Sequence, residues 1–83
     1  MWQYAVSAAG IEFFGKLNPK QRRRIRAILD QLAEHPPLDA VVAFADDRGR
    51  PIQIWRQDEF EILFWPDHSI QELRVIELDW ARG

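Results

Sequence analysis

The sequence has no cysteine and only two histidines, His35 and His68. Without cysteine the chain has no disulfide framework, no thiol nucleophile and no thiolate metal ligand. Two histidines are too few for a metal centre of the usual kind, so we expect neither a metal nor another cofactor. No apolar run approaches the roughly 20 residues that span a membrane, and the N-terminus lacks the pattern of a secretory signal. We therefore expect a cytoplasmic protein with no membrane partner.

The composition favours a folded chain, because 47% of the residues are hydrophobic and 12% are aromatic. A length of 83 residues is enough for one domain and not two, so residues 1–83 are expected to form a single domain. The formal net charge is -2, but the two halves differ. Up to Leu38 there are six Lys or Arg against three acids, and from Asp39 onward five Arg against ten acids. This balance is not that of a protein that binds nucleic acid through its overall charge.

The longest expected element is a helix from Asn18 to His35. Asn18 is a favourable N-cap, Pro19 suits the first helical position, and Gln21 can complete a capping box. The two prolines at positions 36 and 37 end the helix. One stripe roughly 100° wide contains Gln21 and the apolar residues Ile25, Ile28, Leu29 and Leu32. The rest of the chain must cover this stripe.

The other elements are shorter. Trp2 to Val6 alternates in the period of a strand, and Ser7 can cap a short helix from Ala8 to about Leu17, with Ile11 and Phe14 on its buried side. The tight join at Asn18 predicts a helical hairpin. Three or four further strands are expected between short turns, in the segments Ala40 to Ala45, Ile52 to Arg56, Phe60 to Trp65, and Glu72 to Leu78.

This order predicts an α+β fold: an N-terminal strand, a helical hairpin, then antiparallel strands in one small sheet with the helices on one face. Strict alternation predicts which residues face the helices: Ile52, Ile54, Phe60, Ile62 and Phe64. The opposite face is then expected to carry Gln53, Trp55, Glu61, Leu63 and Trp65. The remaining phenylalanines, Phe13, Phe14 and Phe44, are also expected in the core.

Several stretches together resemble a known family: Ala8–Leu17, Ile25–Leu32, His35-Pro36-Pro37, Gly49-Arg50-Pro51-Ile52-Gln53-Ile54-Trp55-Arg56 and Phe60–Trp65. In order and spacing they resemble the RelE/ParE toxins of bacterial type II toxin–antitoxin systems. The resemblance implies a small sheet carrying a helical hairpin, and an antitoxin protein as partner. RelE-like members cut messenger RNA on the ribosome, whereas ParE-like members act on DNA gyrase.

The resemblance also suggests catalytic positions. Arg56 matches the arginine that usually ends the third strand, and Phe60 matches the usual tyrosine. Glu61 stands where the family usually has arginine, and uncharged residues at 52–54 replace the lysines of some RNA-cleaving members. A metal-free ribonuclease needs an acid–base group and cations. Glu61 would be the base, Arg56 and Arg74 would neutralise phosphate, and Arg82 would join them.

Strict alternation raises one difficulty, because it puts Arg56 with Ile54 and away from Glu61 unless the strand ends or bulges there. Two interpretations of Glu61 stay open: a general base, or one half of a cross-strand pair with a neighbouring arginine. Trp55 and Trp65 are expected to share the exposed face. They either stack on bases or anchor a partner, or they are ordinary sheet packing.

The arginines of the long helix allow two interpretations as well. Arg22, Arg23, Arg24 and Arg26 spread over about 200° of the helical wheel, which favours a solvated face. The alternative is a contact with RNA, DNA or an acidic partner. Arg26 can pair with Asp30 one turn later. For the whole chain, three functions remain: a toxin that cleaves messenger RNA, a non-catalytic protein that acts on DNA gyrase or another protein, and a standalone interaction module.

Overall fold

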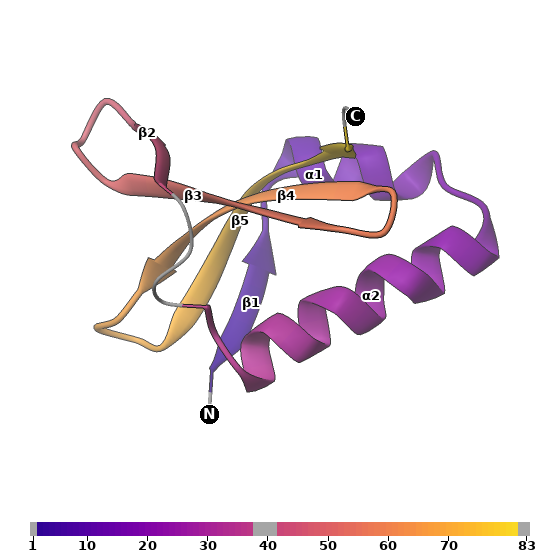
Figure 1. Cartoon of the computed structure of the whole chain (residues 1–83), viewed down its shortest axis with the longest axis horizontal. Helices are drawn as coiled ribbons and strands as arrows, with labels where there is room; N and C mark the ends of the chain where they lie inside the picture. The colour runs from indigo at the N-terminus through magenta and orange to yellow at the C-terminus, as the bar shows by residue number, and fades with distance from the viewer. Residues whose placement is uncertain (1, 38–41, 82–83) are drawn as a thin grey trace.

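The computed structural model describes residues 2–37 and 42–81. Two helices and five strands follow one another along the chain (Figure 1): β1 (Gln3–Val6), α1 (Ala8–Gly15), α2 (Pro19–Glu34), β2 (Val42–Ala45), β3 (Pro51–Gln57), β4 (Phe60–Asp67) and β5 (Glu72–Trp80). The predicted order of elements is confirmed. The last strand continues two residues beyond the predicted end, and α1 ends two residues earlier than predicted.

All five strands form one sheet in the order β1-β5-β4-β3-β2. The pairs from β2 to β5 are antiparallel, as the short turns require. β1 pairs with β5 in parallel, which makes the sheet mixed. The parallel pairing continues into Ser7, whose backbone N–H donates to the Val75 carbonyl at 2.9 Å. The first and the last strand of the fold are therefore neighbours.

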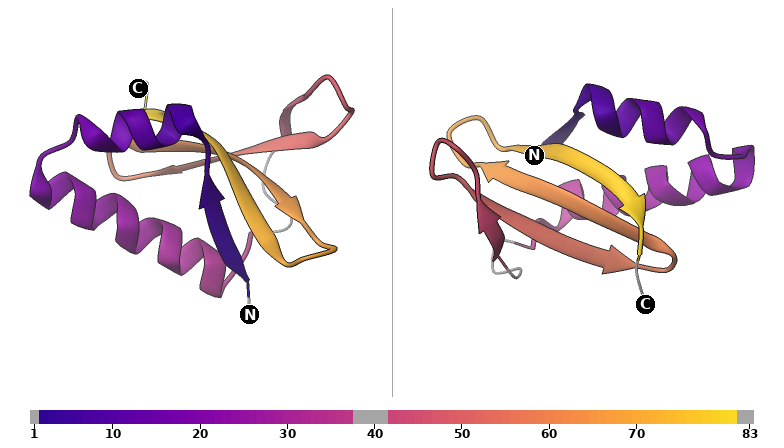
Figure 2. Two further views of the ribbon diagram at one scale, coloured as in Figure 1. Left: turned by 180° about the vertical axis from the view of Figure 1, so that it is seen from behind. Right: turned by 90° about the horizontal axis from the view of Figure 1, so that it is seen from above.

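Both helices lie on one side of the sheet (Figure 2). The predicted start of α2 is confirmed in atomic detail. The Gln21 backbone N–H donates to Oδ1 of Asn18 at 2.8 Å, and the Asn18 N–H donates to Oε1 of Gln21 at 3.0 Å. This capping box satisfies two backbone donors that a helix start leaves open. His35 is the C-terminal cap.

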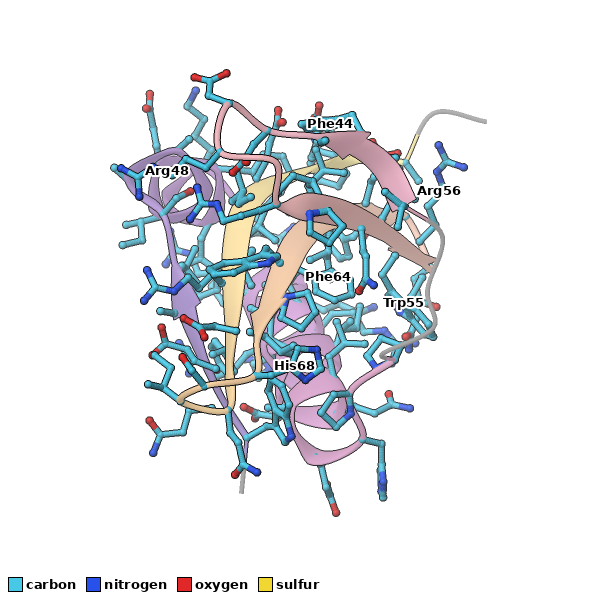
Figure 3. The ribbon with its side chains drawn as sticks, turned by 90° about the vertical axis from the view of Figure 1, so that its left-hand side faces the viewer. Phe44, Arg48, Trp55, Arg56, Phe64 and His68 are labelled. Atoms are coloured by element: carbon cyan, nitrogen blue, oxygen red, sulfur yellow. The ribbon has the colours of Figure 1, made fainter. Side chains whose placement is uncertain are left out.

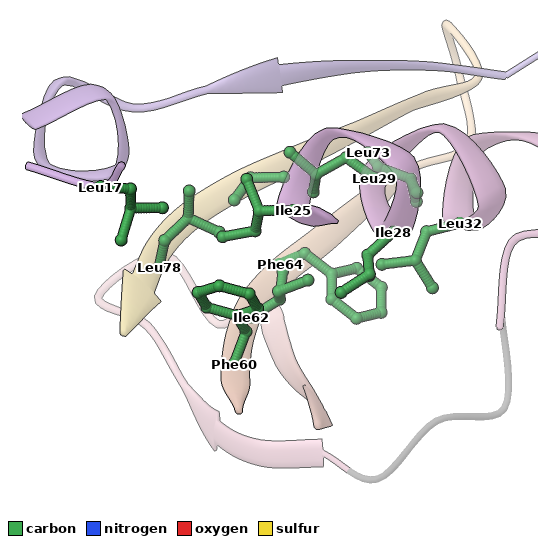
Figure 4. Close-up of a cluster of buried hydrophobic side chains, with 11 residues drawn as sticks. Leu17, Ile25, Ile28, Leu29, Leu32, Phe60, Ile62, Phe64, Leu73 and Leu78 are labelled. Atoms are coloured by element: carbon green, nitrogen blue, oxygen red, sulfur yellow. The ribbon is translucent and has the colours of Figure 1, made fainter. Parts of the chain in front are cut away.

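The core lies between α2 and the sheet (Figure 4). We call the helix-facing side of the sheet the inner face. The predicted stripe of α2 is buried there, except that Gln21 at its end is half-buried. The cluster consists of Leu17, Ile25, Ile28, Leu29, Leu32, Phe60, Ile62, Phe64, Leu73, Val75 and Leu78. Trp2, Tyr4 and Val6 pack against it from β1 and the residue before it.

The predicted buried side of α1 is wrong for Ile11, which is 60% exposed. Gly10 takes the buried position instead, because α1 approaches β1 so closely that a Cβ atom on Gly10 would lie 2.5 Å from Cγ1 of Val6. The next residue then points to solvent. Phe13 and Phe14 are half-buried and contact the core cluster.

The predicted phase of β3 is also wrong. Gln53 pairs with Phe64, and Trp55 pairs with Ile62. Directly paired residues share a face, so Gln53 and Trp55 belong to the inner face and Ile54 to the opposite one. The inner positions of β4 are as predicted. Both sides of β3 carry bulky apolar residues, and alternation alone therefore did not determine which side is inner.

Two further residues depart from prediction near β2. Ile52 is fully buried as expected, but it shares the side of Ile54 and lies outside the main core cluster. Its Cα partner on β2 is Phe44, which is 50% exposed and therefore not the core residue predicted. The predicted β2 residues Ala40 and Val41 lie outside the described part of the chain.

Candidate functional site on the outer face of the sheet

The face turned away from the two helices carries most of the residues that the sequence singles out. We call it the outer face. Three rows of cross-strand neighbours define it: Arg56, Glu61 and Asp79; Ile54, Leu63 and Glu77; and Trp65, Arg74 and Ala5. Ile52 and Ile76 complete it beside β2, where they line a common groove with Phe44.

Arg56 and Glu61 form the first feature of this face. They are direct partners on β3 and β4, and Nε of Arg56 lies 3.0 Å from Oε1 of Glu61. Arg56 does share a face with Ile54, but the expected separation from Glu61 is wrong, because the register brings Glu61 to that same face without a bulge between β3 and β4. The cross-strand pair that was one interpretation of Glu61 is therefore present.

Trp65 is the second feature, and two arginines lie over its ring. The guanidinium carbon of Arg50 is 4.7 Å from the ring centroid, and that of Arg74 is 5.8 Å away. Arg50 is held in turn by Asp46, with Nε and Oδ2 2.6 Å apart. Sequence reasoning missed Arg50. Its signal was its place at the junction of the turn and β3, between Gly49 and Pro51.

Arg74 pairs with two carboxylates, at 3.5 Å from Asp67 and 3.5 Å from Glu72. The pairing of β4 with β5 shifts between Leu63 and Phe64, and the extra residue turns Leu78 into the core. Arg74 and Leu78 therefore lie on opposite faces of β5.

The three predicted catalytic residues lie on one face but not in one cluster. Glu61 and Trp65 are four residues apart on β4, which corresponds to about 13 Å along a strand. Arg74 pairs opposite Trp65, and its side chain reaches toward Asp67, away from Glu61. Arg56 and Glu61 therefore form one unit, and Arg50, Trp65 and Arg74 form another.

The charge of the outer face is negative. Four arginines (Arg48, Arg50, Arg56 and Arg74) meet seven carboxylates (Asp46, Asp47, Glu61, Asp67, Glu72, Glu77 and Asp79), which gives a formal net charge of -3. Burial acts to raise the pKa of Asp46, but hydrogen bonds from Arg50 and Arg48 outweigh it and hold the pKa below its ordinary value. The Ser69 hydroxyl donates to Asp67 and lowers the pKa of that carboxyl. Both groups therefore stay ionised at neutral pH.

The arginines of α2 lie on the other side of the sheet. Arg22 donates to the carbonyl oxygens of Phe14 and Gly15, at 3.3 and 2.9 Å. It thereby provides hydrogen-bond donors for two carbonyl groups at the C-terminal end of α1. Arg26 lies over the Phe14 ring, 5.6 Å from its centroid. No ion pair between Arg26 and Asp30 is present among the described residues, so the predicted pair is wrong.

Arg23 is exposed and borders an open groove with Asp58 and Glu59, the two residues that join β3 to β4. Arg24 closes part of that groove, because its Nη2 atom lies 2.6 Å from Oδ2 of Asp58. Asp30 lies beside Tyr4. Burial raises the pKa of the Tyr4 phenol, and the neighbouring Asp30 carboxylate raises it further.

The expectation that Trp55 and Trp65 share a face is wrong. Trp55 packs against the core from the inner face, and its Nε1–H donates to Oε1 of Gln57 at 3.0 Å. In Figure 3, which labels Trp55 and Arg56, these consecutive residues of β3 come from opposite sides of the strand. Arg82, the remaining predicted contact residue, lies outside the described part of the chain.

Within residues 2–37 and 42–81, no group of three or more His, Cys, Asp or Glu side chains is arranged to hold a metal ion. His68 is exposed in the β4–β5 turn, where its ring meets Trp2 edge-on at 5.4 Å. No helix among the described residues has the length and apolar character needed to cross a membrane.

The chain matches no known family model and no curated protein sequence. Its fold nevertheless matches solved structures over the whole chain. The isolated RelE toxin of E. coli superimposes with a TM-score of 0.72 at 13% identity, over 100% of this chain and 87% of that one. The chain has the RelE toxin fold.

Two toxin–antitoxin complexes give the same result for the RelE-like fold. A chain of the RelBE2 complex from Mycobacterium tuberculosis matches with a TM-score of 0.78 at 12% identity, over 96% of this chain and 98% of that one. A chain of the archaeal RelE–RelB complex from Pyrococcus horikoshii matches at 0.73 and 12%, over 99% and 98%. The strand, helix pair and four further strands of the structure therefore correspond to a RelE-like architecture.

Proposed function

We propose that this protein is the toxin-like component of a type II toxin–antitoxin pair, acting in the cytoplasm as a single domain and held inactive by an antitoxin protein. The observation that carries this proposal is the match to an isolated RelE toxin over the whole chain. Two of the matching structures are complexes with a RelB antitoxin, which supports an antitoxin partner here.

The outer face favours action by protein binding over cleavage of RNA. A phosphate backbone requires a surplus of cations, and this face has a surplus of carboxylates. Three of its four arginines, Arg50, Arg56 and Arg74, already lie within 3.5 Å of a carboxylate oxygen. Ile52 and Ile54 stand where RNA-cleaving relatives are expected to carry lysines. We therefore place DNA gyrase or another protein ahead of messenger RNA as the target.

The Arg56–Glu61 contact keeps a ribonuclease as the second candidate. A carboxylate 3.0 Å from a guanidinium is a base beside a phosphate-binding cation. In that case Glu61 would accept the proton of a 2′-hydroxyl, and Arg56 would stabilise the charge that develops on phosphorus. Arg74 would act at a distance, as a phosphate contact in the second unit of the face.

Controlled expression in a bacterial host tests both candidates. Expression of the wild-type chain should arrest growth, and coexpression of the product of a short adjacent gene should relieve the arrest. The variants Arg56→Ala and Glu61→Gln should arrest growth as the wild type does, and primer extension should show no new messenger RNA ends. Glu12→Gln, on the far side of the fold, is the matched control for the two variants.

Each result decides something. Absence of growth arrest from a folded, expressed chain would contradict the toxin proposal and favour the standalone interaction module. New RNA ends that disappear in Arg56→Ala would replace protein binding by the ribonuclease. A change in plasmid supercoiling without RNA cleavage would identify gyrase as the target.

A further inference from the structure

We propose that the open edge of β2 pairs with β2 of a second copy, antiparallel and about a twofold axis, so that two five-stranded sheets become one. The inference goes beyond the proposed function and does not rest on it. β2 is the last strand in the order of the sheet, whereas α1 packs against β5 and α2 against β1, toward the other edge (Figure 1, Figure 2). The backbone N–H and C=O groups on the open side of an edge strand can bind another strand.

The side chains of β2 do little to protect this edge. All four residues are exposed, and the two large ones, Val42 and Phe44, are 52% and 50% exposed. The strand reads Val-Ala-Phe-Ala, without the charges or the proline that keep edge strands apart in many monomeric sheets. By contrast, the exposed residues of β1, the other edge strand, are Gln3 and Ala5. The exposed apolar surface therefore points to β2 as the edge that pairs.

The order of side chains in β2 fits an antiparallel pairing of the strand with itself. Val42 and Ala45 pair with alternate residues of β3, so both belong to the inner face. Because directly paired residues share a face, a twofold axis between Ala43 and Phe44 pairs Val42 with Ala45 of the second copy. Phe44 then lies across from Ala43 of the second copy. Each large side chain meets a small one, and both have room at the junction.

The charges that follow β2 favour the same orientation. Asp46 and Asp47 come directly after the strand. In the antiparallel pair the two Asp46 residues lie on opposite sides of the axis, about 16 Å apart along the strands, which exceeds a Debye length of about 8 Å. A parallel pair in register would put each carboxylate beside its own copy. A twofold contact is also closed, so the association ends at a dimer.

The dimer is expected to be weak. A strand of four residues supplies far fewer contacts than the roughly 20 residues a side of a standard stable interface. The bulge between Val42 and Phe44 interrupts the regular ladder further. The monomer should therefore predominate in dilute solution, and the dimer should form as the concentration rises.

Sedimentation velocity of the full chain over a range of concentrations tests the association. It should show a monomer–dimer equilibrium. Val42→Lys should weaken dimerisation about tenfold, because the twofold axis places the new charge at two positions of the joined edges. Ile70→Lys is the matched control, since Ile70 is 57% exposed in the β4–β5 turn and the same kind of change there should leave the dimer unaffected. Circular dichroism shows whether both variants are folded.

Cysteine cross-linking tests the register, because the chain has no cysteine of its own. A mixture of the Val42→Cys and Ala45→Cys variants should form a disulfide-linked dimer under mild oxidation, since directly opposed strand residues have their Cα atoms within disulfide range. Either variant alone should form far less, because its two thiols are three residues, or about 10 Å, apart along the strands.

Four results would overturn the inference. They are a wild-type monomer at every concentration, equal loss of the dimer in Ile70→Lys and Val42→Lys, cross-linking of each cysteine variant with itself as readily as with the other, and a ladder of species larger than a dimer. None of these measurements depends on toxicity. A dimer without growth arrest would contradict the proposed function alone, and growth arrest by a monomer would contradict the edge pairing alone.

Discussion

Arg56 and Glu61 face each other across β3 and β4, with 3.0 Å between Nε and Oε1. The Arg56 side chain is 59% exposed, whereas that of Glu61 is 15% exposed. The arginine therefore lies partly over the carboxylate and shields it from solvent. This geometry explains how a mostly buried acid is accommodated near the start of β4, between Phe60 and Ile62, which are both buried on the opposite side.

The contribution of this pair to stability should be small. We expect a double-mutant cycle of Arg56→Ala and Glu61→Ala to give a coupling free energy of about 1 kcal/mol, because solvent around the mostly exposed Arg56 screens the pair although Glu61 is mostly buried. Urea unfolding of the four proteins measures the coupling. A value above about 2 kcal/mol would show that the pair is an organising contact of the sheet and would contradict its assignment to an exposed surface.

The two glycines of α1 should respond in opposite directions to alanine. Gly10→Ala should lower the free energy of unfolding by about 1–3 kcal/mol, because the new Cβ would meet Cγ1 of Val6 at 2.5 Å. Gly15→Ala should raise it by about 0.4–1 kcal/mol. The new Cβ would meet no neighbouring atom within 4 Å, and alanine reduces the conformational freedom of the unfolded chain. Thermal and urea unfolding of both variants would detect the difference. Equal effects of the two substitutions would contradict the close approach of α1 to β1.

Ile62 and Leu63 are consecutive residues of β4 on opposite faces, and they form a matched pair for the core. Ile62→Ala should cost about 2–5 kcal/mol, and the milder Ile62→Val about 0.5–1.5 kcal/mol, because Ile62 is fully buried between α2 and the sheet. Leu63→Ala should cost about 1 kcal/mol or less, as expected for a partly exposed position. A larger effect at Leu63 than at Ile62 would contradict the assigned faces.

The carboxyl of Asp67 should report on the β4–β5 turn. Ser69→Ala removes the hydroxyl that donates at 2.6 Å, so the pKa of Asp67 should rise toward its ordinary value of 3.8. A depressed pKa stabilises the folded state above the ordinary value and loses this effect as the pH falls through the folded value. Stability below about pH 4 should therefore depend less on pH in Ser69→Ala.

Carboxyl carbon shifts in an NMR titration would follow the pKa of Asp67 directly. Ser69→Thr keeps the hydroxyl and should keep the low pKa, which makes it the control for the alanine variant. If both variants titrate like the wild type, the hydrogen bond from Ser69 is not what lowers the pKa.

Local signals in the sequence were sufficient for several elements. The start of α2 is set by the capping box between Asn18 and Gln21 and by Pro19 at the first helical position. The buried apolar residues of α2 lie on one side of the helix only. The short turns leave antiparallel pairing as the one solution for β2 to β5. On β4, Phe60, Ile62 and Phe64 alternate with other residues, of which Glu61 is charged. The prediction that these three side chains face the core was correct.

The features that the sequence did not predict depend on contacts between residues far apart in the chain. The phase of β3 depends on which of two apolar sides meets α2, and the residues Ile54 and Trp55 do not encode that choice alone. Gly10 rather than Ile11 is buried because of the distance between α1 and β1, which no spacing in α1 reveals. The pair of Arg50 and Trp65 joins residues from a turn and from β4, and it depends on the register between the strands. Candidate sites made of such pairs need the fold to be known first.

The parallel pairing of β1 and β5 has a mechanical consequence. In Figure 1 the chain enters β1 at one end of the sheet and leaves β5 at the other. Tension applied through residues before Gln3 and after Trp80 would slide the two strands past each other. Their backbone hydrogen bonds would then share the load instead of opening one after another. An unfolding motor that pulls on both ends would meet its greatest resistance at this pair of strands, whereas one that pulls on β2 could peel the sheet from its other edge.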